Sequence, residues 1–380
     1  MCIRDRTLST KEKRKKMLSP ESNCLENDYI KININENGTL EVFSKETGAL
    51  YSGIGYFLDE SNLRTDGTYE IQPVLSTEEI KPSIKLLYNG PSGAAYKINY
   101  VWDIPSEINK KTKERSSKLD AIKVSSIISL DRFSKYLDMV VSFVNKASNH
   151  TLKICFPIDF KTDFSYAGGR FDIVSRRIGN TKKFSGKGRE PITFLMNNFV
   201  GISRDDDNFT VITDGLTEYE ILKAKKQIAA ITLFRDISSI NNPFKGRCHL
   251  CFYPHLGRWE SGQIINETYS HNIGLEVFRK EKSAGNLPTQ IEFLRISPDD
   301  LIFSTLKYKE SGEGIVLRLF NPTNYVINGE VFTYLPIRSV ELLSLEELVI
   351  DFLEIDNENK FAIKVKPKKI ITLRLSFRNN

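Results

Sequence analysis

Residues 136–157, YLDMVVSFVNKASNHTLKICFP, decide the fold of this 380-residue chain. Apolar side chains occupy alternate positions on both sides of a polar segment: Leu137, Met139, Val141 and Phe143 before it, and Leu152, Ile154 and Phe156 after it. In a β-strand alternate side chains lie on one face, whereas a helix would need apolar residues three and four positions apart. The polar segment 145–150 has the composition of a loop. We therefore predict a hairpin of two long antiparallel strands with one shared buried face.

The same alternation recurs from residue 23 to residue 377, in short to medium runs separated by turn residues. The Asn37-Gly38 pair, for example, supplies a turn that tolerates positive φ. Residues 106–119 are charged and nearly free of apolar side chains, which predicts an exposed loop. Only residues 263–277 have a helical spacing, and that spacing is weak. The pattern predicts an all-β fold built of antiparallel sandwiches.

Shifts in composition divide the chain into three parts. Residues 1–19 are basic and have no periodicity, so we predict that they are unstructured. Residues 20–284 are expected to form a large antiparallel β-sandwich, and residues 285–380 a small one of immunoglobulin-like size. The opening sequence MCIRDR looks like translated sequencing-adapter read-through. We accordingly expect the chain to be the tail of a longer protein whose beginning was lost.

The composition is ordinary for a globular protein, with 40% hydrophobic residues, 27% charged residues and a net charge of +6. The basic runs 11–16 and 110–115 carry no interleaved aromatic residues, which favours a solvated surface over nucleic-acid binding. No apolar run approaches the roughly 20 residues that span a bilayer, so no membrane contact is expected. Five cysteines at scattered positions favour a reducing compartment, and we expect a cytoplasmic protein.

Cys248 and Cys251 form the sharpest local motif, Cys-His-Leu-Cys. A structural zinc site needs four ligands, and the sequence has no second pair of this kind. In a strand, residues three apart also point to opposite faces. We therefore expect buried thiols and no metal site in this chain. The acidic run 205–207 likewise lacks the spacing of a calcium loop.

Two polar strings follow glycine turns and have side chains suited to sugar hydroxyls: GGRFDIVSRR at 168–177 and DGLTEYE at 214–220. From them we select five candidates for the lining of a sugar site: Arg170, Asp172, Arg176, Arg177 and Tyr219. Long donors and a phenol suit hydroxyl groups, and arginine keeps its charge throughout the working pH range. The alternative interpretation is that these residues make ion pairs on the surface of the sandwich strands.

Taken together, the strings of this chain resemble the C-terminal region of the glycoside hydrolase family 38 α-mannosidases. The likeness runs from about residue 25 to residue 377. Besides the central stretch, the matching strings are LENDYI at 25–30, NGTL at 37–40, KETG at 45–48, GRFD at 169–172, GLTEYE at 215–220, TLFR at 232–235, RLFNPT at 318–323 and KPKKIITL at 366–373.

This resemblance implies a large galactose-mutarotase-like β-sandwich followed by a small immunoglobulin-like one. It also implies retaining hydrolysis of α-mannosides by an aspartate nucleophile beside a zinc ion, both held in an N-terminal α/β barrel. The sequence shows no alternation of strands and helices and no histidine-aspartate zinc set, so we carry over no catalytic residue and no metal ligand. The expected partners of the chain are this barrel and, in the complete enzyme, an α-mannoside; zinc would belong to the barrel.

Two other interpretations stay open. The chain could be a free-standing carbohydrate-binding or scaffold protein without chemistry of its own. It could also be an enzyme in its own right, such as a sugar epimerase of the mutarotase-like fold, which would need a histidine and a glutamate in one cleft. A region that packs against a further domain should expose a wide apolar patch, whereas a self-sufficient module should not.

Overall fold

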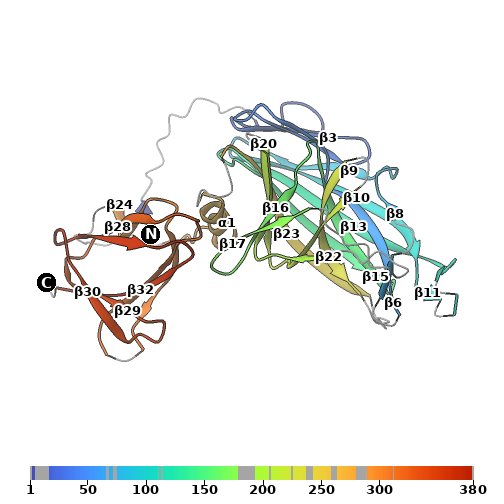
Figure 1. Ribbon diagram of the computed structural model, residues 1–380. Coiled ribbons are helices and arrows are strands. Elements are labelled where there is room, and N and C mark those ends of the chain that lie inside the picture. The colour runs from blue at the N-terminus through green and yellow to red at the C-terminus, as the bar shows by residue number, and fades with distance from the viewer. Residues whose placement is uncertain are drawn as a thin grey trace. The chain divides into compact units, whose positions relative to one another are not determined.

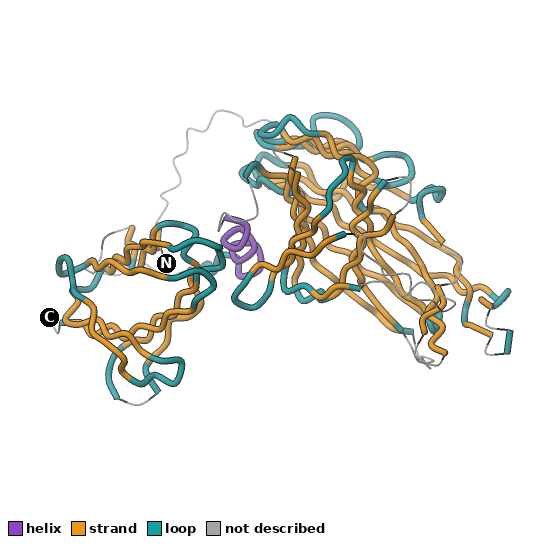
Figure 2. Tube along the Cα trace, viewed as in Figure 1, coloured by secondary structure: helices purple, strands orange, loops and turns teal. Residues whose placement is uncertain are grey.

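The computed structural model divides the chain into two compact units. It describes residues 2–4, 17–65, 68–71, 75–109, 111–112, 114–178, 193–204, 207–223, 226–236, 243–257, 263–279, 288, 290–310 and 312–378. The large unit comprises Arg14–Gly168 and Ser175–Arg258, and the small unit comprises Met1–Lys13, Gly169–Val174 and Trp259–Asn380. Strands make up most of the described residues of both units (Figures 1 and 2), which confirms the all-β prediction.

Two broad antiparallel sheets build the large unit. The first is nine-stranded, in the order β17 (Ile173–Arg177), β16 (Phe164–Gly168), β19 (Phe199–Arg204), β20 (Asp207–Asp214), β23 (Phe244–His255), β14 (Leu137–Asn145), β13 (Leu119–Asp131), β10 (Gly93–Pro105) and β9 (Ser83–Asn89). The second is seven-stranded, in the order β18 (Phe194–Leu195), β21 (Glu218–Lys223), β22 (Gln227–Arg235), β15 (His150–Ile158), β6 (Tyr56–Thr65) and β7 (Thr68–Ile71), with β8 (Leu75–Ser76) also paired to β6.

Smaller elements complete this unit. A four-stranded sheet consists of β2 (Cys24–Glu26), β3 (Ile30–Ile34), β4 (Leu40–Ser44) and β5 (Leu50–Ile54), and β11 (Ile108–Asn109) pairs with β12 (Glu114–Arg115). The turn between β3 and β4 contains Gly38 at φ +78°, as the Asn-Gly pair predicted.

The small unit is a sandwich of a three-stranded and a five-stranded sheet. The three-stranded sheet has the order β25 (Leu294–Ser297), β28 (Ile327–Thr333) and β31 (Lys360–Val365). The five-stranded sheet has the order β26 (Ile302–Tyr308), β27 (Ile315–Phe320), β32 (Ile370–Phe377), β29 (Ile337–Leu343) and β30 (Val349–Leu353). In addition, β1 (Cys2–Arg4) pairs with β24 (Gln290–Glu292), and α1 spans Gln263–Ile273.

The strands β14 and β15, which the sequence predicted as a hairpin, do not pair with each other. β14 lies between β13 and β23 in the nine-stranded sheet, and β15 lies between β22 and β6 in the seven-stranded sheet. Their alternating apolar residues nevertheless meet in one core, because the two sheets face each other. The shared buried face is confirmed and the pairing is wrong, since alternation tells which face is buried but not which strand lies alongside.

The segment that joins β14 to β15 is an arch with a buried polar network. The imidazole of His150 bonds through Nδ1 to Asp59 Oδ1 at 2.6 Å and through Nε2 to Asn145 Oδ1 at 3.0 Å. Asn145 also donates to Ala147 O at 2.8 Å, and Arg115 forms a buried ion pair with Asp59. The predicted exposed loop at 106–119 is therefore wrong in part, because Arg115 and its short strand belong to this network.

Several other expectations concern the ends of elements. The helix predicted over 263–277 is confirmed as α1, although it ends at Ile273. The predicted domain boundary at 284/285 falls in residues 280–287, outside the described residues, and so does most of the predicted unstructured segment 1–19. No helix among the described residues is long and apolar enough to cross a membrane.

One buried histidine makes the stability of the large unit depend on pH. His255, at the end of β23, bonds through Nε2 to Thr210 Oγ1 at 3.0 Å and through Nδ1 to Leu256 O at 3.2 Å. The carbonyl can only accept, so Nδ1 carries a proton and donates to it. Burial lowers the pKa of His255 from 6.5 to about 4.

We predict that stability falls as the pH drops from 6.5 to 4, because the unfolded chain binds a proton that folded His255 does not. The contribution of this residue should be about 3 kcal/mol over that interval. The free energy of unfolding in urea is measured at pH 7, 5.5 and 4 for the wild type and for His255→Gln, since the variant has no imidazole to titrate. Equal pH slopes for the two proteins would show that the histidine does not carry the effect.

Candidate functional site

Two of the five residues predicted from sequence, Arg176 and Tyr219, lie together at one edge of the large sandwich. Tyr219 is buried on β21, and its hydroxyl is hydrogen bonded to Ser165 Oγ at 3.0 Å. Arg176 Nη1 donates to the same hydroxyl at 3.3 Å. The guanidinium group also lies over the rings of Phe194 at 5.5 Å and Tyr219 at 5.9 Å. This half-buried arginine is therefore held by stacking and by one hydrogen bond.

The other three predicted residues do not join this pair by any described contact. Arg170 and Arg177 are exposed. Asp172 belongs to the small unit, where it forms an ion pair with Lys368, and Lys368 Nζ also donates to Pro322 O at 2.6 Å. For Asp172 the structure thus shows the surface ion pair that was the alternative interpretation. Whether any of the five lines a sugar site stays a prediction.

The string 215–220 is divided between the two faces of its sheet, because alternate residues of β21 point to opposite sides. Tyr219 points into the sandwich core, whereas Glu220 lies on the other face. There Lys153 Nζ of β15 donates to Glu220 Oε2 at 2.9 Å and to Glu60 Oε2 of β6 at 2.6 Å. Thr193 Oγ1 donates to the second oxygen of Glu220 at 2.8 Å.

This cluster of Lys153, Glu60 and Glu220 is buried although it lies outside the sandwich core. Burial alone would lower the pKa of Lys153, but the charges of Glu220 and Glu60 and their hydrogen bonds outweigh it, and the pKa is raised. The lysine is thus charged at any physiological pH. Thr232 is paired directly with Lys153 across β15 and β22, and its buried hydroxyl has no hydrogen-bond partner among the described residues.

The two glutamates of the cluster are not a catalytic pair. Glu60 Oε2 and Glu220 Oε2 both bind Lys153 Nζ, at 2.6 and 2.9 Å, so the two oxygens are close together. By distance alone, the two carboxyl groups could serve a retaining glycosidase. Lys153 stands between them, however, and neutralises the charge that a nucleophile or a general base would need. The cluster is therefore structural: it binds three strands of one sheet, β6, β15 and β21, on the face away from the core.

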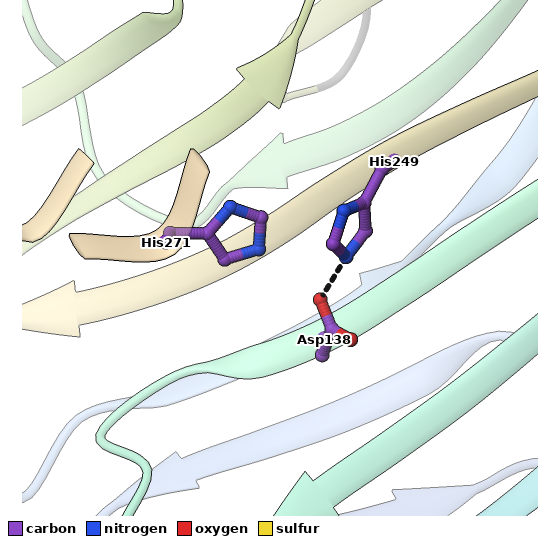
Figure 3. A group of neighbouring side chains, drawn as sticks. All are labelled: Asp138, His249 and His271. Carbon is purple, nitrogen blue, oxygen red and sulfur yellow. Dashed lines mark hydrogen bonds and ion pairs between the residues drawn. The ribbon is translucent and has the colours of Figure 1, made fainter. Parts of the chain in front are cut away.

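A histidine and an aspartate, His249 and Asp138, form a pair on the nine-stranded sheet. His249 Nε2 of β23 bonds to Asp138 Oδ1 of β14 at 2.6 Å, and both side chains are about one-third exposed (Figure 3). His271, also drawn there, belongs to α1 in the small unit and bonds through Nδ1 to Asn272 Oδ1 at 2.9 Å. The carboxylate of Asp138 orients the imidazole of His249, as in many sites where a histidine is held for binding.

The thiols of Cys248 and Cys251 point to opposite sides of β23, as their spacing predicted. Cys248 is part of the sandwich core, where its Sγ lies 4.0 Å from Leu233 O, and burial raises its pKa to about 11. Cys251 is buried outside that core cluster. Two thiols on opposite faces cannot bind one ion, so this motif does not fit the zinc that the resemblance implies for the complete enzyme.

Sequence reasoning missed the Lys153 cluster and the Asp59–His150 network for one reason. Their members come from separate strands, so no single stretch of the sequence contains either group. A lysine inside an otherwise apolar strand was the available signal, because an unpaired lysine is almost never fully buried.

Comparisons with known proteins agree with this architecture. The model of the glycosyl hydrolases family 38 C-terminal domain matches residues 25–239, and that of the family 38 C-terminal beta sandwich domain matches residues 300–373. A protein of Halalkalibacterium halodurans named "Putative mannosylglycerate hydrolase" is 24% identical over 392 residues, covering 96% of this chain and 43% of that protein.

Two solved structures are similar in fold. An alpha-mannosidase from Enterococcus faecalis V583 has a TM-score of 0.84 at 20% identity, over 96% of this chain and 43% of that one. A glycosyl hydrolase family 38 protein from Enterococcus faecalis has a TM-score of 0.80 at 20% identity, over 97% of this chain and 45% of that one. This chain thus spans less than half the length of the relatives that it matches.

The Lys153 cluster generates a stability prediction. Lys153→Met should destabilise the large unit by about 3–5 kcal/mol, because it leaves two buried carboxylates without a counter-charge. Replacing all three residues, in Lys153→Met/Glu60→Gln/Glu220→Gln, should recover much of that loss. Denaturant unfolding of the purified variants measures both values.

Lys226→Met is the matched control, because Lys226 pairs with Asp159 on the surface and its side chain is 55% exposed. Its loss should cost about 0–1 kcal/mol. If Lys153→Met is as mild as Lys226→Met, the cluster does not hold the three strands together.

Proposed function

The chain belongs to family 38 of the glycosyl hydrolases, and we propose that it is the β-rich C-terminal region of a retaining α-mannosidase. In this proposal the large sandwich supports the sugar site from one side, and a catalytic barrel elsewhere in the complete enzyme cleaves the bond. The match of the family's C-terminal domain to residues 25–239 and the names of the relatives support it. The function proposed for this chain is therefore to bind and position, not to cleave.

The observation that carries the proposal is an exposed apolar segment in the small unit, directly after α1. Within residues 273–278, the side chains of Ile273, Leu275, Val277 and Phe278 are 77%, 96%, 91% and 83% exposed. Four large apolar side chains in six residues are costly to leave in water, at about 1.5–3 kcal/mol each. Surfaces of this kind mark contacts with other protein, so the segment favours a region that packs against a further domain over a self-sufficient module.

The residue best placed to meet a sugar is Arg176, because Tyr219, its hydrogen-bond partner, is fully buried. Arg176 is half-buried and fixed at the edge of the sandwich by Phe194 and Tyr219, and a guanidinium group carries five donor hydrogens. Among the described residues its guanidinium group makes one hydrogen bond, to the hydroxyl of Tyr219. A donor that is already oriented loses little entropy when it binds a hydroxyl group. Its role would be to bind the mannoside, with the proton transfers left to carboxyl groups of the barrel.

Zinc enters this proposal only through the barrel. When bound there, it would polarise and orient the mannoside beside the aspartate nucleophile. In the part of the chain that the structure describes, Glu60 and Glu220 are engaged by Lys153, and the Cys248–Cys251 motif is split between two faces. None of these residues is proposed as a ligand or as a catalytic group.

The exposed segment gives the first test. Leu275→Asp/Phe278→Asp should leave the melting temperature of the isolated chain unchanged, since both side chains are already in water. In the complete enzyme the same change should lower the melting temperature and the activity on an aryl α-mannoside, because it buries two charges at the contact. Phe133→Asp, at an exposed phenylalanine of the large unit, is the matched control. A complete enzyme that tolerates the double change as well as the control would rule out this contact.

The five polar residues give the second test. In the complete enzyme, loss of one charged hydrogen bond to the sugar should cost about 1.5–3 kcal/mol of transition-state stabilisation. We expect Arg176→Ala to lower kcat/KM by this amount, far less than loss of the nucleophile. Arg170, Asp172, Arg177 and Tyr219 are to be replaced by alanine in parallel, with unfolding curves to exclude misfolding. If all five variants keep full kcat/KM, the sugar site lies elsewhere.

A further inference from the structure

The small unit has a groove of about 650 Å³ on the outer face of its three-stranded sheet. The groove is lined by eight residues from the three strands and the turn after β25: Ser297, Pro298, Asn328, Gly329, Glu330, Ala362, Ile363 and Lys364. Gly329 and Ile363 are directly paired on β28 and β31. Because the Ile363 side chain lies in the core and Gly329 has none, these two contribute backbone and form the floor.

The sequence explains why the sheet is hollow at this place. β25 pairs with β28 only as far as Ser297, opposite Glu330, and Pro298 then follows without the N–H that would continue the ladder. Gly329 lies on the core-facing side of β28, where a Cβ would be 2.8 Å from Leu301 Cδ2 and 2.9 Å from Ser297 O, so on the outer face it contributes only backbone. Ala362 is short and stands between two lysines on the same face of β31. The end of β25 and the short side chain of Ala362 together leave the depression.

The polar groups of the groove are divided by charge. At one end, Glu330 Oε1 accepts from Lys360 Nζ at 2.6 Å, and the two charges cancel. At the other end Asn328 and Lys364 are a directly paired amide and ammonium on β28 and β31. Both are exposed, and no described residue forms a hydrogen bond or ion pair with either side chain. The groove therefore has a cationic end and, beside Ser297 and Glu330, an end with hydroxyl and carboxylate groups.

We propose that this groove binds a small hydroxylated carboxylate, the chemical class of the sugar acids. The ammonium of Lys364 and the amide of Asn328 would take the carboxylate, since both donate hydrogen bonds and one carries the opposite charge. Ser297 and Glu330 would take hydroxyl groups, which can donate to Glu330 and accept from the serine. The volume accommodates a ligand of this size, because ligand pockets range from about 300 to 1,000 Å³. All residues of this site belong to the small unit, and the proposal stands whether or not the function proposed above is correct.

Three probes distinguish binding through the carboxylate from binding through the hydroxyl groups on the isolated chain. Gluconate has both kinds of group, mannitol has only hydroxyl groups, and acetate has only a carboxylate. Binding is measured by calorimetry or by NMR line shifts at pH 7 and low salt. We expect gluconate to bind at least about fivefold more tightly than either of the other two. Added sodium chloride should weaken the binding of gluconate and leave the binding of mannitol unchanged, because only gluconate pairs with the charge of Lys364.

The variants Lys364→Met and Asn328→Ala should each lower the affinity for gluconate about fivefold and leave the affinity for mannitol unchanged. Both side chains are exposed, so unfolding curves should not change. Arg338→Met, which removes an exposed cation on β29 of the other sheet, is the matched control and should bind gluconate like the wild type. The proposal is overturned if gluconate fails to bind below about 50 mM, if all three probes bind alike, or if Lys364→Met binds as the wild type does.

Discussion

The large sandwich depends on the arch between Asn145 and His150, where the chain leaves one sheet and enters the other. The strands on both sides of the arch point their apolar faces at the same core, so the polar side chains of Asn145 and His150 at its two ends are buried. Such groups must be hydrogen bonded, because each buried group without a partner costs about 1–3 kcal/mol. The contacts of His150 with Asp59 and Asn145 meet this requirement. They also fix the point at which β15 begins, and with it the register of the seven-stranded sheet.

The register of β15 decides where its charged residue stands. With Leu152 and Ile154 facing the core, Lys153 must lie on the opposite face, level with strands β6 and β22. The same rule places Glu220 opposite Tyr219 on β21. The alternation of side chains therefore places the ion cluster and the buried Tyr219, which Arg176 contacts at the edge of the sandwich, on opposite faces of the seven-stranded sheet. A shift of one residue in β21 would turn Glu220 toward the core and Tyr219 away from it.

The sequence allowed the fold class to be predicted, but the pairing of the strands only in part. Alternation in residues 137–156 identified the buried faces, and turn residues such as Gly38 located ends of strands. Alternation carries no information on neighbours, so β14 and β15 were paired with each other although they face each other across the core. Arg115 was assigned to an exposed loop because its neighbours are charged, yet its guanidinium reaches Asp59, 56 residues away. Arg176 and Tyr219 were predicted as sugar-site residues from their type and their position after glycine turns, and that role stays a prediction. The cluster around Lys153 assembles only in three dimensions.

Burial distinguishes the polar groups that hold this protein together from those able to hold something else. Lys153 is enclosed and bonded to two carboxylates, and an ammonium in that setting cannot turn to a ligand without leaving two buried charges behind. Arg176 is also held, but by ring faces and a phenol, which keep it in place without neutralising it. A cation fixed by aromatic rings retains its charge and donor hydrogens for a partner that arrives from solvent. In the proposed function the sugar contacts of the large sandwich lie at this edge, and the ion cluster links β6, β15 and β21, the last of which carries Tyr219.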